Sequence, residues 1–270
     1  MELEGSNALI TGGGRGIGKA VAAELLRRGA TVTVLEIEKE HITVAQEELA
    51  ELSASGERLA FHLGSVTSAD DVDAAFGLAA DRFGPVGLLV NNAGTAALAP
   101  VVEMTEESWD LIVDTCLKGT FLCTRAYARA AIAADLGGAV VNISSLNAIA
   151  ATDGLGHYCA AKAGVSQFTK VCAGELGRHD IRVNAIAPGT TRTPLGEGFT
   201  VGRMGEEFLA RTLVGRTPRH GEAQDIADVT AFLLSDLAAR ITGVTIPVDG
   251  GGHVRGLFSY WDVAKEEGLV

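Results

Sequence analysis

A tyrosine and a lysine four residues apart, Tyr158 and Lys162, are the residues in this sequence whose types and spacing most directly suggest catalysis. If the segment is helical, the two side chains share a face, with Cβ atoms about 5–6 Å apart. An ammonium group at that distance lowers the pKa of the phenol from its usual value of about 10. Tyr158 is therefore a candidate general acid or base, and Ser145 is a candidate hydrogen-bond donor to a substrate oxygen. Taken alone, each feature has a common structural explanation: Tyr and Lys four residues apart occur by chance on many helices, and a Ser at the end of a strand is often a helix cap.

A glycine-rich stretch, TGGGRGIGK (residues 11–19), is typical of a loop that binds phosphate. Read from Gly13 it nearly matches a P-loop, but Ala20 stands where a P-loop has the Ser or Thr that binds Mg²⁺. Read from Gly12 it is a loose form of the dinucleotide fingerprint, in which glycines let the backbone approach a pyrophosphate at a helix N-terminus. Glu36, at the end of the next predicted strand, stands where an acid would bond ribose hydroxyls. The dinucleotide interpretation is therefore favoured.

The choice between NAD and NADP depends on two residues. The carboxylate of Glu36 repels a 2′-phosphate, and Ile37 beside it offers no compensating cation. Arg15, inside the glycine loop, favours NADP because it could pair with that phosphate. We expect NAD as the cofactor, with NADP as the alternative.

Strand-like and helix-like segments alternate along the whole chain. Short apolar runs predict strands, and the longer segments between them have helical patterns; the predicted strands are residues 8–10, 30–36, 58–64, 86–94, 138–145, 181–189 and 244–251. This alternation predicts an α/β fold, a single Rossmann-type doubly wound parallel sheet of about seven strands with helices on both faces. Ligands bind beyond the carboxyl ends of the strands in such sheets, so the candidate residues should converge there.

Composition excludes several other classes of protein. The net charge of −12 disfavours nucleic acid and anionic membranes as partners, and no apolar stretch is long enough to span a bilayer. The opening MELEGSNALIT does not resemble a signal peptide, and the four cysteines have no C-x-x-C spacing. A cytoplasmic protein with reduced thiols is expected. The histidines form no ligand set, so no metal is expected.

The motifs together resemble those of the classical short-chain dehydrogenase/reductase family. The matching stretches are TGGGRGIG (11–18), NNAG (91–94), the Ser145/Tyr158/Lys162 set, IRVNAIAPG (181–189), T-x-T-P (191–194) and ITGVTIPVDGG (241–251). The resemblance implies a seven-stranded sheet in one domain, residues 1–251, that carries both the cofactor site and the catalytic site. It also implies transfer of a hydride between nicotinamide and an alcohol or carbonyl carbon.

The resemblance assigns roles to individual residues. Tyr158 would be the acid or base, Ser145 would orient the substrate, and Lys162 would lower the tyrosine pKa and bond the nicotinamide ribose. The expected cofactor-binding residues are Gly12, Arg15, Gly16, Ile17, Gly18, Glu36, Ser65, Val66, Asn91, Ala93, Gly94, Tyr158, Lys162, Pro188, Gly189, Thr191 and Thr193.

Three positions depart from the family pattern. Cys116 stands where the family usually has an Asn that helps to hold a water for proton transfer to the lysine. A thiol is a weak hydrogen-bonding group, so slower proton exchange is expected, although the backbone carbonyl of Cys116 could still hold the water. Ser65 replaces an acid that usually contacts adenine, and Gly87 replaces an Asp to which we assign no function.

Two segments are expected to shape the substrate pocket. Residues 195–215 combine glycines and apolar side chains as a mobile lid would, and the candidate pocket residues are Leu146, Asn147, His157, Leu195, Phe199 and Met204. The tail, residues 252–270, carries Phe258, Tyr260 and Trp261 and is expected to dock on the domain or on a neighbouring subunit of a dimer or tetramer.

The sequence therefore predicts an NAD-dependent enzyme that acts on a secondary alcohol or its ketone. One alternative is an NADP-dependent 3-oxoacyl-(acyl-carrier-protein) reductase, which the absence of a basic patch and the presence of Glu36 disfavour. Another is a weakly catalytic NAD-binding sensor or scaffold, which only Cys116 supports.

Overall fold

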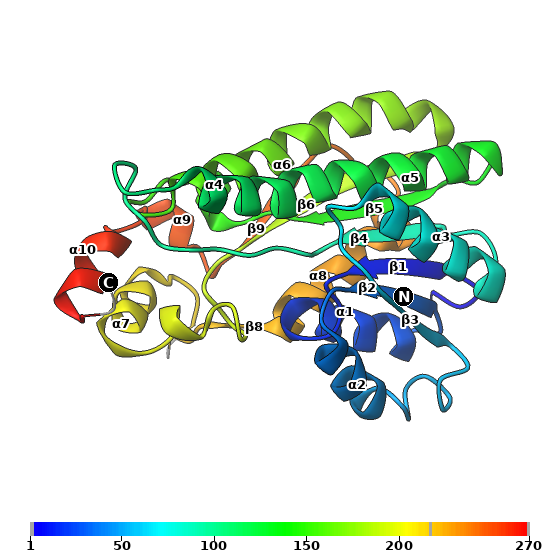
Figure 1. Ribbon diagram of the computed structural model, residues 1–270, viewed down its shortest axis with the longest axis horizontal. Coiled ribbons are helices and arrows are strands. Elements are labelled where there is room, and N and C mark those ends of the chain that lie inside the picture. The colour runs from blue at the N-terminus through cyan, green and yellow to red at the C-terminus, as the bar shows by residue number, and fades with distance from the viewer. Residues whose placement is uncertain (1–2, 216–217, 269–270) are drawn as a thin grey trace.

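A seven-stranded parallel sheet forms the centre of the protein, in a computed structural model that describes residues 3–215 and 218–268 (Figure 1). Its strand order is β3-β2-β1-β4-β5-β6-β9. The strands are β1 (Asn7–Thr11), β2 (Thr31–Glu36), β3 (Leu59–Leu63), β4 (Leu88–Asn91), β5 (Gly138–Ile143), β6 (Ile181–Pro188) and β9 (Thr245–Val248). The prediction of a doubly wound α/β fold is confirmed.

Helices cover both faces of this sheet (Figure 1). One face is covered by α1 (Gly16–Arg27), α2 (Lys39–Glu48) and α8 (Ala223–Leu234). The other is covered by α3 (Ala69–Phe83), α4 (Glu106–Val113), α5 (Gly119–Ala133) and α6 (Gly156–Leu176). The strands are apolar on both sides because both faces of the sheet are buried.

The alternation of side chains along β1 shows how the two layers share one strand. Ala8 and Ile10 pack into the cluster with α1 and α8, and Leu9 between them packs with α3 and α5. All three are fully buried, as expected for successive residues of a strand that point to opposite faces.

The long helix expected over residues 105–134 is interrupted. A π-helical turn, Asp114–Lys118, separates α4 from α5. A π-helical turn within a helix is rare and often marks a functional site. Cys116 lies in the middle of this turn.

The order of the strands places a crevice at the carboxyl ends of β1 and β4. The chain runs outward from β1 through β2 to β3 and then returns to the other side of β1 as β4. Consecutive crossovers on opposite sides of β1 leave an opening above these two strand ends, which is where ligands bind in doubly wound sheets.

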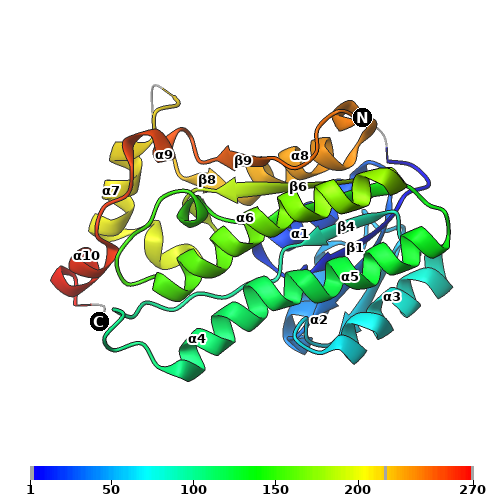
Figure 2. The same cartoon turned by 90° about the horizontal axis from the view of Figure 1, so that it is seen from above.

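Short elements beyond the strand ends form a lid and a tail (Figure 2). The lid, residues 195–215, contains α7 (Gly202–Arg211), and β7 (Thr191–Arg192) and β8 (Gly221–Glu222) on either side of it pair as a small ribbon. The tail contains α9 (Gly252–Arg255) and α10 (Tyr260–Glu266). In one apolar cluster, Tyr260 and Val263 of the tail pack with Met204 and Phe208 of α7. An ion pair between Arg203 and Glu266 also joins tail and lid. The described part of the tail therefore docks on its own chain.

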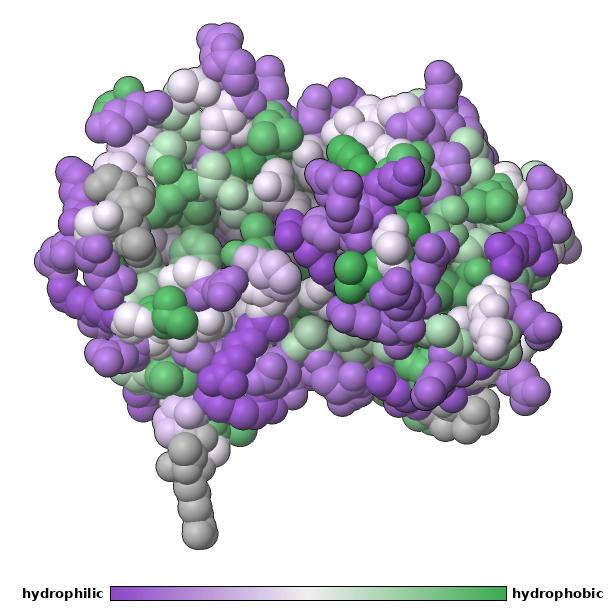
Figure 3. All heavy atoms as spheres, turned by 60° about the horizontal axis from the view of Figure 1, so that its bottom comes forward, coloured by the Kyte–Doolittle hydropathy of each residue, from purple (hydrophilic) through white to green (hydrophobic). Residues whose placement is uncertain are grey.

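The surface is predominantly hydrophilic on the face seen in Figure 3, where purple side chains surround smaller patches of apolar ones. Among the described residues, no helix combines the length and the apolar character needed to cross a membrane.

Candidate active site

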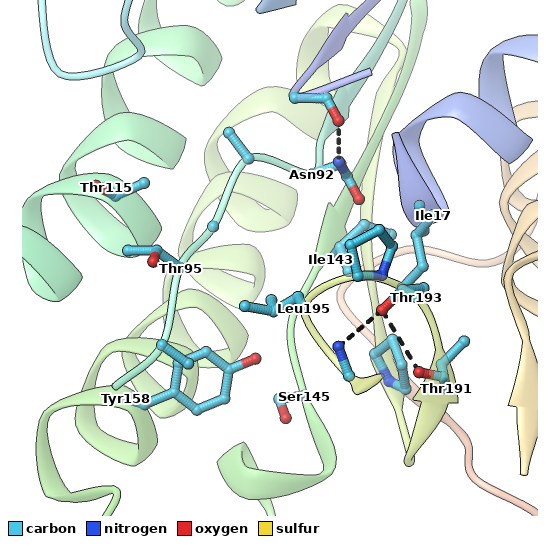
Figure 4. A pocket seen from close by; sticks show the side chains of 18 of the residues that line it. Ile17, Asn92, Thr95, Thr115, Ile143, Ser145, Tyr158, Thr191, Thr193 and Leu195 are labelled. Atoms are coloured by element: carbon cyan, nitrogen blue, oxygen red, sulfur yellow. Dashed lines mark hydrogen bonds between the residues drawn. The ribbon is translucent and has the colours of Figure 1, made fainter. Parts of the chain in front are cut away.

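A cavity of about 510 Å³ lies over the carboxyl ends of the strands. One end is bounded by Glu36, and the other reaches Ser145, Tyr158 and the lid residue Phe199. Figure 4 shows side chains from α1, the segment after β4, β5 and the lid facing a common space. The cavity therefore connects the two sets of residues that the sequence singled out.

The glycine loop is held against β4 by Asn92. Its side-chain Nδ2 donates to the carbonyl oxygens of Thr11 (3.0 Å) and Gly12 (2.8 Å). Gly12 and Gly16 have positive φ angles of 64° and 54°, which favour glycine. A Cβ at Gly18 would lie 2.2 Å from the Gly12 carbonyl oxygen. Gly18 thus allows close packing of the loop but does not line the cavity, contrary to its expected role as a cofactor-binding residue.

The start of α1 fits an anionic ligand. The residue that caps it, Arg15, makes no side-chain hydrogen bond to the helix, and the first turn contains no acidic residue. Gly16 and Ile17, the first residues of the helix, line the cavity. Free backbone N–H groups and the helix dipole at such a terminus suit a pyrophosphate.

Glu36 fits the ribose of a dinucleotide. Only 5% of its surface is exposed, yet it lines the cavity. Its carboxylate accepts hydrogen bonds from the backbone N–H of Gly14 (2.9 Å), Ile37 (3.0 Å) and Glu38 (3.2 Å). A Cβ at Gly14 would lie 2.8 Å from Oε2 of Glu36, so the glycine allows this approach. A buried acceptor of this kind suits hydroxyl donors and repels a further anion.

The catalytic candidates meet at the other end of the cavity. Tyr158 and Lys162 lie on α6, and Ser145 follows β5; in Figure 4 the side chains of Tyr158 and Ser145 face the same space. Lys162 is 4% exposed, its Nζ donates to the Ile143 carbonyl oxygen at 2.8 Å, and it lies 5.7 Å from the centroid of the Tyr158 ring. The ammonium group is thus fixed beside the phenol.

The pKa of Tyr158 differs from the sequence-based expectation. Burial in the pocket raises the pKa of Tyr158, while the Lys162 ammonium and the nearby Ser145 hydroxyl lower it. Burial outweighs the lysine in the protein alone, so Lys162 by itself does not produce the expected lowering of the pKa. Tyr158 is therefore protonated near neutral pH and can donate a proton. To accept a proton from an alcohol it must first ionise, and Lys162 limits the cost of that ionisation.

Cys116 lies behind the catalytic residues and does not line the cavity. It is 1% exposed, and its thiol donates to the Thr95 carbonyl oxygen at 3.5 Å. A Cβ at Gly94 would meet both Cys116 Sγ (3.5 Å) and Lys162 Nζ (3.4 Å), so the thiol and the ammonium lie near the same point. The carbonyl oxygen of Cys116, expected to be able to hold a water, accepts a bond from the Thr120 hydroxyl at 2.8 Å.

Asn91 does not lie where the family resemblance placed it. It is 4% exposed and points into the protein, where Nδ2 donates to Thr124 (3.0 Å) and to Asn142 (2.8 Å). Alternation along β4 turns this side chain away from the cavity, and Asn92 lines it instead. The prediction that Asn91 contacts the cofactor is therefore corrected.

Two of the expected pocket residues are also displaced. His157 is fully buried, and its Nδ1 accepts a hydrogen bond from the Tyr158 backbone N–H at 2.9 Å. Burial lowers the pKa of His157. Met204 is 2% exposed and packs in the apolar cluster between lid and tail. Neither residue lines the cavity, so neither directly shapes the pocket.

The remaining predicted site residues do line the cavity. They are Gly12, Arg15, Gly16, Ile17, Glu36, Ser65, Val66, Ala93, Gly94, Ser145, Leu146, Asn147, Tyr158, Lys162, Pro188, Gly189, Thr191, Thr193, Leu195 and Phe199. Sequence reasoning missed His41, Asn92, Thr95, Phe208 and Tyr260 as lining residues. The aromatic cluster in the tail was the only sequence signal for Tyr260.

Among the residues that the structure describes, no group of three or more His, Cys, Asp or Glu side chains is placed to hold a metal ion.

Comparisons with known proteins agree with this geometry. The family model described as Enoyl-(Acyl carrier protein) reductase matches residues 12–253. The 3-oxoacyl-(acyl-carrier-protein) reductase FabG of Thermotoga maritima is 37% identical over 93% of this chain and 99% of its own length. The D-threitol dehydrogenase of Mycolicibacterium smegmatis is 37% identical over 94% of this chain and 95% of its own length.

Solved structures give the same result. A short-chain type dehydrogenase/reductase from Mycobacterium ulcerans has a TM-score of 0.93 and 31% identity, covering 98% of this chain and 96% of its own. Levodione reductase has a TM-score of 0.86 and 32% identity, covering 93% of this chain and 98% of its own. The chain belongs to the short-chain dehydrogenase/reductase family of oxidoreductases, which use a nicotinamide cofactor.

Proposed function

We propose that this protein is an NAD-dependent dehydrogenase or ketone reductase that interconverts a small secondary alcohol and its ketone. The observation that carries this proposal is the single cavity that joins Glu36 to Ser145 and Tyr158. The glycine loop and the start of α1 would hold the pyrophosphate, and Glu36 would bond the ribose hydroxyls. A bound nicotinamide supplies or accepts the hydride.

The residues of this chain would handle the substrate oxygen and its proton. Ser145 would hold the oxygen by a hydrogen bond, and Tyr158 would give a proton to the forming alkoxide or take one from the alcohol. Lys162 would stabilise the ionised tyrosine, because its ammonium is buried and fixed to the Ile143 carbonyl. Apolar side chains of the lid, Leu195, Phe199 and Phe208, would exclude water from the reacting atoms.

The choice of NAD rests on the buried carboxylate of Glu36, supported by the exposed Glu38 next to it. Arg15 is exposed at the mouth of the glycine loop and favours NADP. We give more weight to Glu36 because it is fixed by three backbone hydrogen bonds, whereas an exposed arginine is solvated.

A second candidate is reduction of a 3-oxoacyl group on a carrier protein, with NADP. The name of the Thermotoga maritima relative favours this alternative. The net charge of −12 opposes it, because an acidic carrier would be repelled. A sensor or scaffold with little catalysis is opposed by the convergence of Ser145, Tyr158 and Lys162 on one cavity.

The assembly, domain division and location are further parts of this proposal. We place one domain over residues 1–251, closed by the tail 252–270, in a cytoplasmic homodimer or homotetramer. Large apolar side chains exposed on the helices of one face, Trp109 and Phe121 among them, are candidate subunit contacts. Light scattering coupled to gel filtration measures the oligomeric state.

The test of function is the rise in absorbance of reduced cofactor when the protein meets a panel of secondary alcohols at mildly alkaline pH. Each alcohol is tried with NAD⁺ and with NADP⁺, and a signal with NAD⁺ is expected. The substitution Tyr158→Phe should lower the turnover rate by about 10²- to 10⁴-fold. Tyr127→Phe, a buried tyrosine that bonds the Gly87 carbonyl outside the cavity, is the matched control. Equal turnover of Tyr158→Phe and wild type would refute the mechanism.

A further inference from the structure

An amide donor in the cavity has no role in the mechanism above. Asn147 lines the cavity beside Ser145, and its Nδ2 is shielded from solvent without a hydrogen-bond partner. A buried donor left unpaired costs about 1–3 kcal/mol, so such groups are rare unless a ligand or water pairs with them. The position of this amide, next to the catalytic serine, points to the substrate as its partner.

The bonds of Ser145 provide a second, complementary group. Ser145 Oγ donates to Asn147 Oδ1 at 3.2 Å and accepts from the Asn147 backbone N–H at 3.1 Å. A hydroxyl has one proton, so Ser145 must turn away from Asn147 when it donates to a substrate oxygen. Asn147 Oδ1 then loses its donor. With substrate bound, the Asn147 side chain therefore presents both a free donor and a free acceptor.

Tyr260 brings a third polar group to the same place from the tail. It lines the cavity, and its ring packs against Phe199 at 5.7 Å, Phe208 at 5.1 Å and Phe258 at 4.9 Å between centroids. Burial raises the pKa of Tyr260, and the nearby Asn147 amide lowers it. The Tyr260 phenol is thus a neutral donor and acceptor close to the Asn147 amide.

The walls around this polar pair are apolar. Leu146, Leu155, Leu195, Phe199 and Phe208 line the same end of the cavity. No charged side chain other than Lys162 is among the described residues that line this end, so the pocket suits an uncharged substrate with few polar groups.

We propose that Asn147 and Tyr260 recognise a second hydroxyl next to the reacting carbon, and that the substrate is a vicinal diol or α-hydroxy ketone with an apolar remainder. A hydroxyl both donates and accepts, which matches the two groups that Asn147 presents. In the oxidation, the reacting alcohol would give its proton to Tyr158 in its ionised, phenolate form and its hydride to NAD⁺, and the second hydroxyl is unchanged. This inference rests on the proposed alcohol dehydrogenase function.

The experiment compares matched alcohols that differ by one hydroxyl. The pairs are butane-2,3-diol with butan-2-ol, and 1-phenylpropane-1,2-diol with 1-phenylpropan-2-ol, each oxidised with NAD⁺ and with NADP⁺. The wild-type protein should favour the diol by about tenfold to a hundredfold in kcat/KM, as expected for one buried hydrogen-bonding group that is otherwise unpaired.

Two variants test the residues. Asn147→Leu, close in size, should bring the diol-to-monoalcohol ratio near one. Tyr260→Phe keeps the ring contacts and should reduce the ratio by about threefold to tenfold. Tyr127→Phe loses a buried tyrosine hydroxyl outside the cavity and should keep the wild-type ratio. Circular dichroism melts of all three variants check that they are folded.

The outcomes separate this inference from the proposed function. Equal efficiency on diol and monoalcohol would overturn the role of Asn147 and Tyr260 while leaving the alcohol dehydrogenase intact. A wild-type preference for diols that survives in both Asn147→Leu and Tyr260→Phe would assign recognition to other residues and also overturn the inference. Oxidation of neither alcohol with either cofactor, in any pair, would overturn both proposals.

Discussion

The substitution Glu36→Gln should shift the cofactor preference of the protein from NAD⁺ toward NADP⁺. The carboxylate lines the cavity at the end of β2 and is 5% exposed, so solvent screens its charge poorly. Glutamine preserves the size of the side chain and removes the charge. It also places an amide N–H among the backbone donors that now bond the carboxylate, so some affinity for NAD⁺ should be lost as well.

The size of the shift follows from the burial of this charge. Two like charges about 4 Å apart repel each other by about 4 kcal/mol at an effective dielectric constant of about 20. Removing that repulsion corresponds to about a thousandfold gain for NADP⁺ relative to NAD⁺, as an upper value. The loss of hydrogen bonds to ribose hydroxyls, worth about 1–3 kcal/mol, acts in the same direction on the ratio.

The assay is isothermal titration calorimetry of both cofactors with the wild-type protein and the variant, together with the ratio of kcat/KM values. Glu38→Gln is the matched control, because Glu38 lines the same end of the cavity but is exposed. It should change the ratio by less than about tenfold, since solvent screens an exposed charge. An unchanged ratio in Glu36→Gln, or a wild-type protein that prefers NADP⁺, would refute the reasoning.

Two further predictions concern catalysis and the glycine loop. Lys162→Met removes the ammonium that lowers the pKa of Tyr158, so that pKa should rise further. Because Tyr158 must be ionised to accept the alcohol proton, the rising limb of the alcohol oxidation profile should move to higher pH. A rising limb that stays in place in kcat/KM measured against pH would exclude this pair as the titrating groups. Gly18→Ala places a methyl group 2.2 Å from the Gly12 carbonyl oxygen and should cost about 1–3 kcal/mol of stability. Gly77→Ala on α3, where a Cβ meets nothing within 4 Å, should instead raise the melting temperature slightly, and equal thermal melts for the two variants would contradict the packing argument.

Local sequence patterns were sufficient to predict the fold of the protein and most of the residues that line the candidate site. The alternation of apolar runs and helical segments predicted the parallel sheet, because each crossover unit is recognisable over about 30 residues. The glycine loop, Glu36 and the Ser145/Tyr158/Lys162 set were also readable, since each follows a strand or lies on one helix face. The rule that strand ends converge then placed them in one cavity.

The orientation of individual side chains required the structure. Asn91 and Asn92 are identical in type, and only the register of β4 decides that the first points inward and the second bonds the glycine loop. The π-helical turn around Cys116 was likewise not revealed by helical periodicity.

The sequence by itself determined the fold and the family, because both depend on short motifs with fixed spacing. Tertiary structure decided the properties of the pocket. Tyr260 reaches the cavity from the tail across more than a hundred residues of chain from Tyr158, and burial raises the pKa of Tyr158 despite the nearby lysine. Both facts result from long-range packing, which decides which side chains are buried next to one another. The spacing of residues along the chain does not specify these contacts.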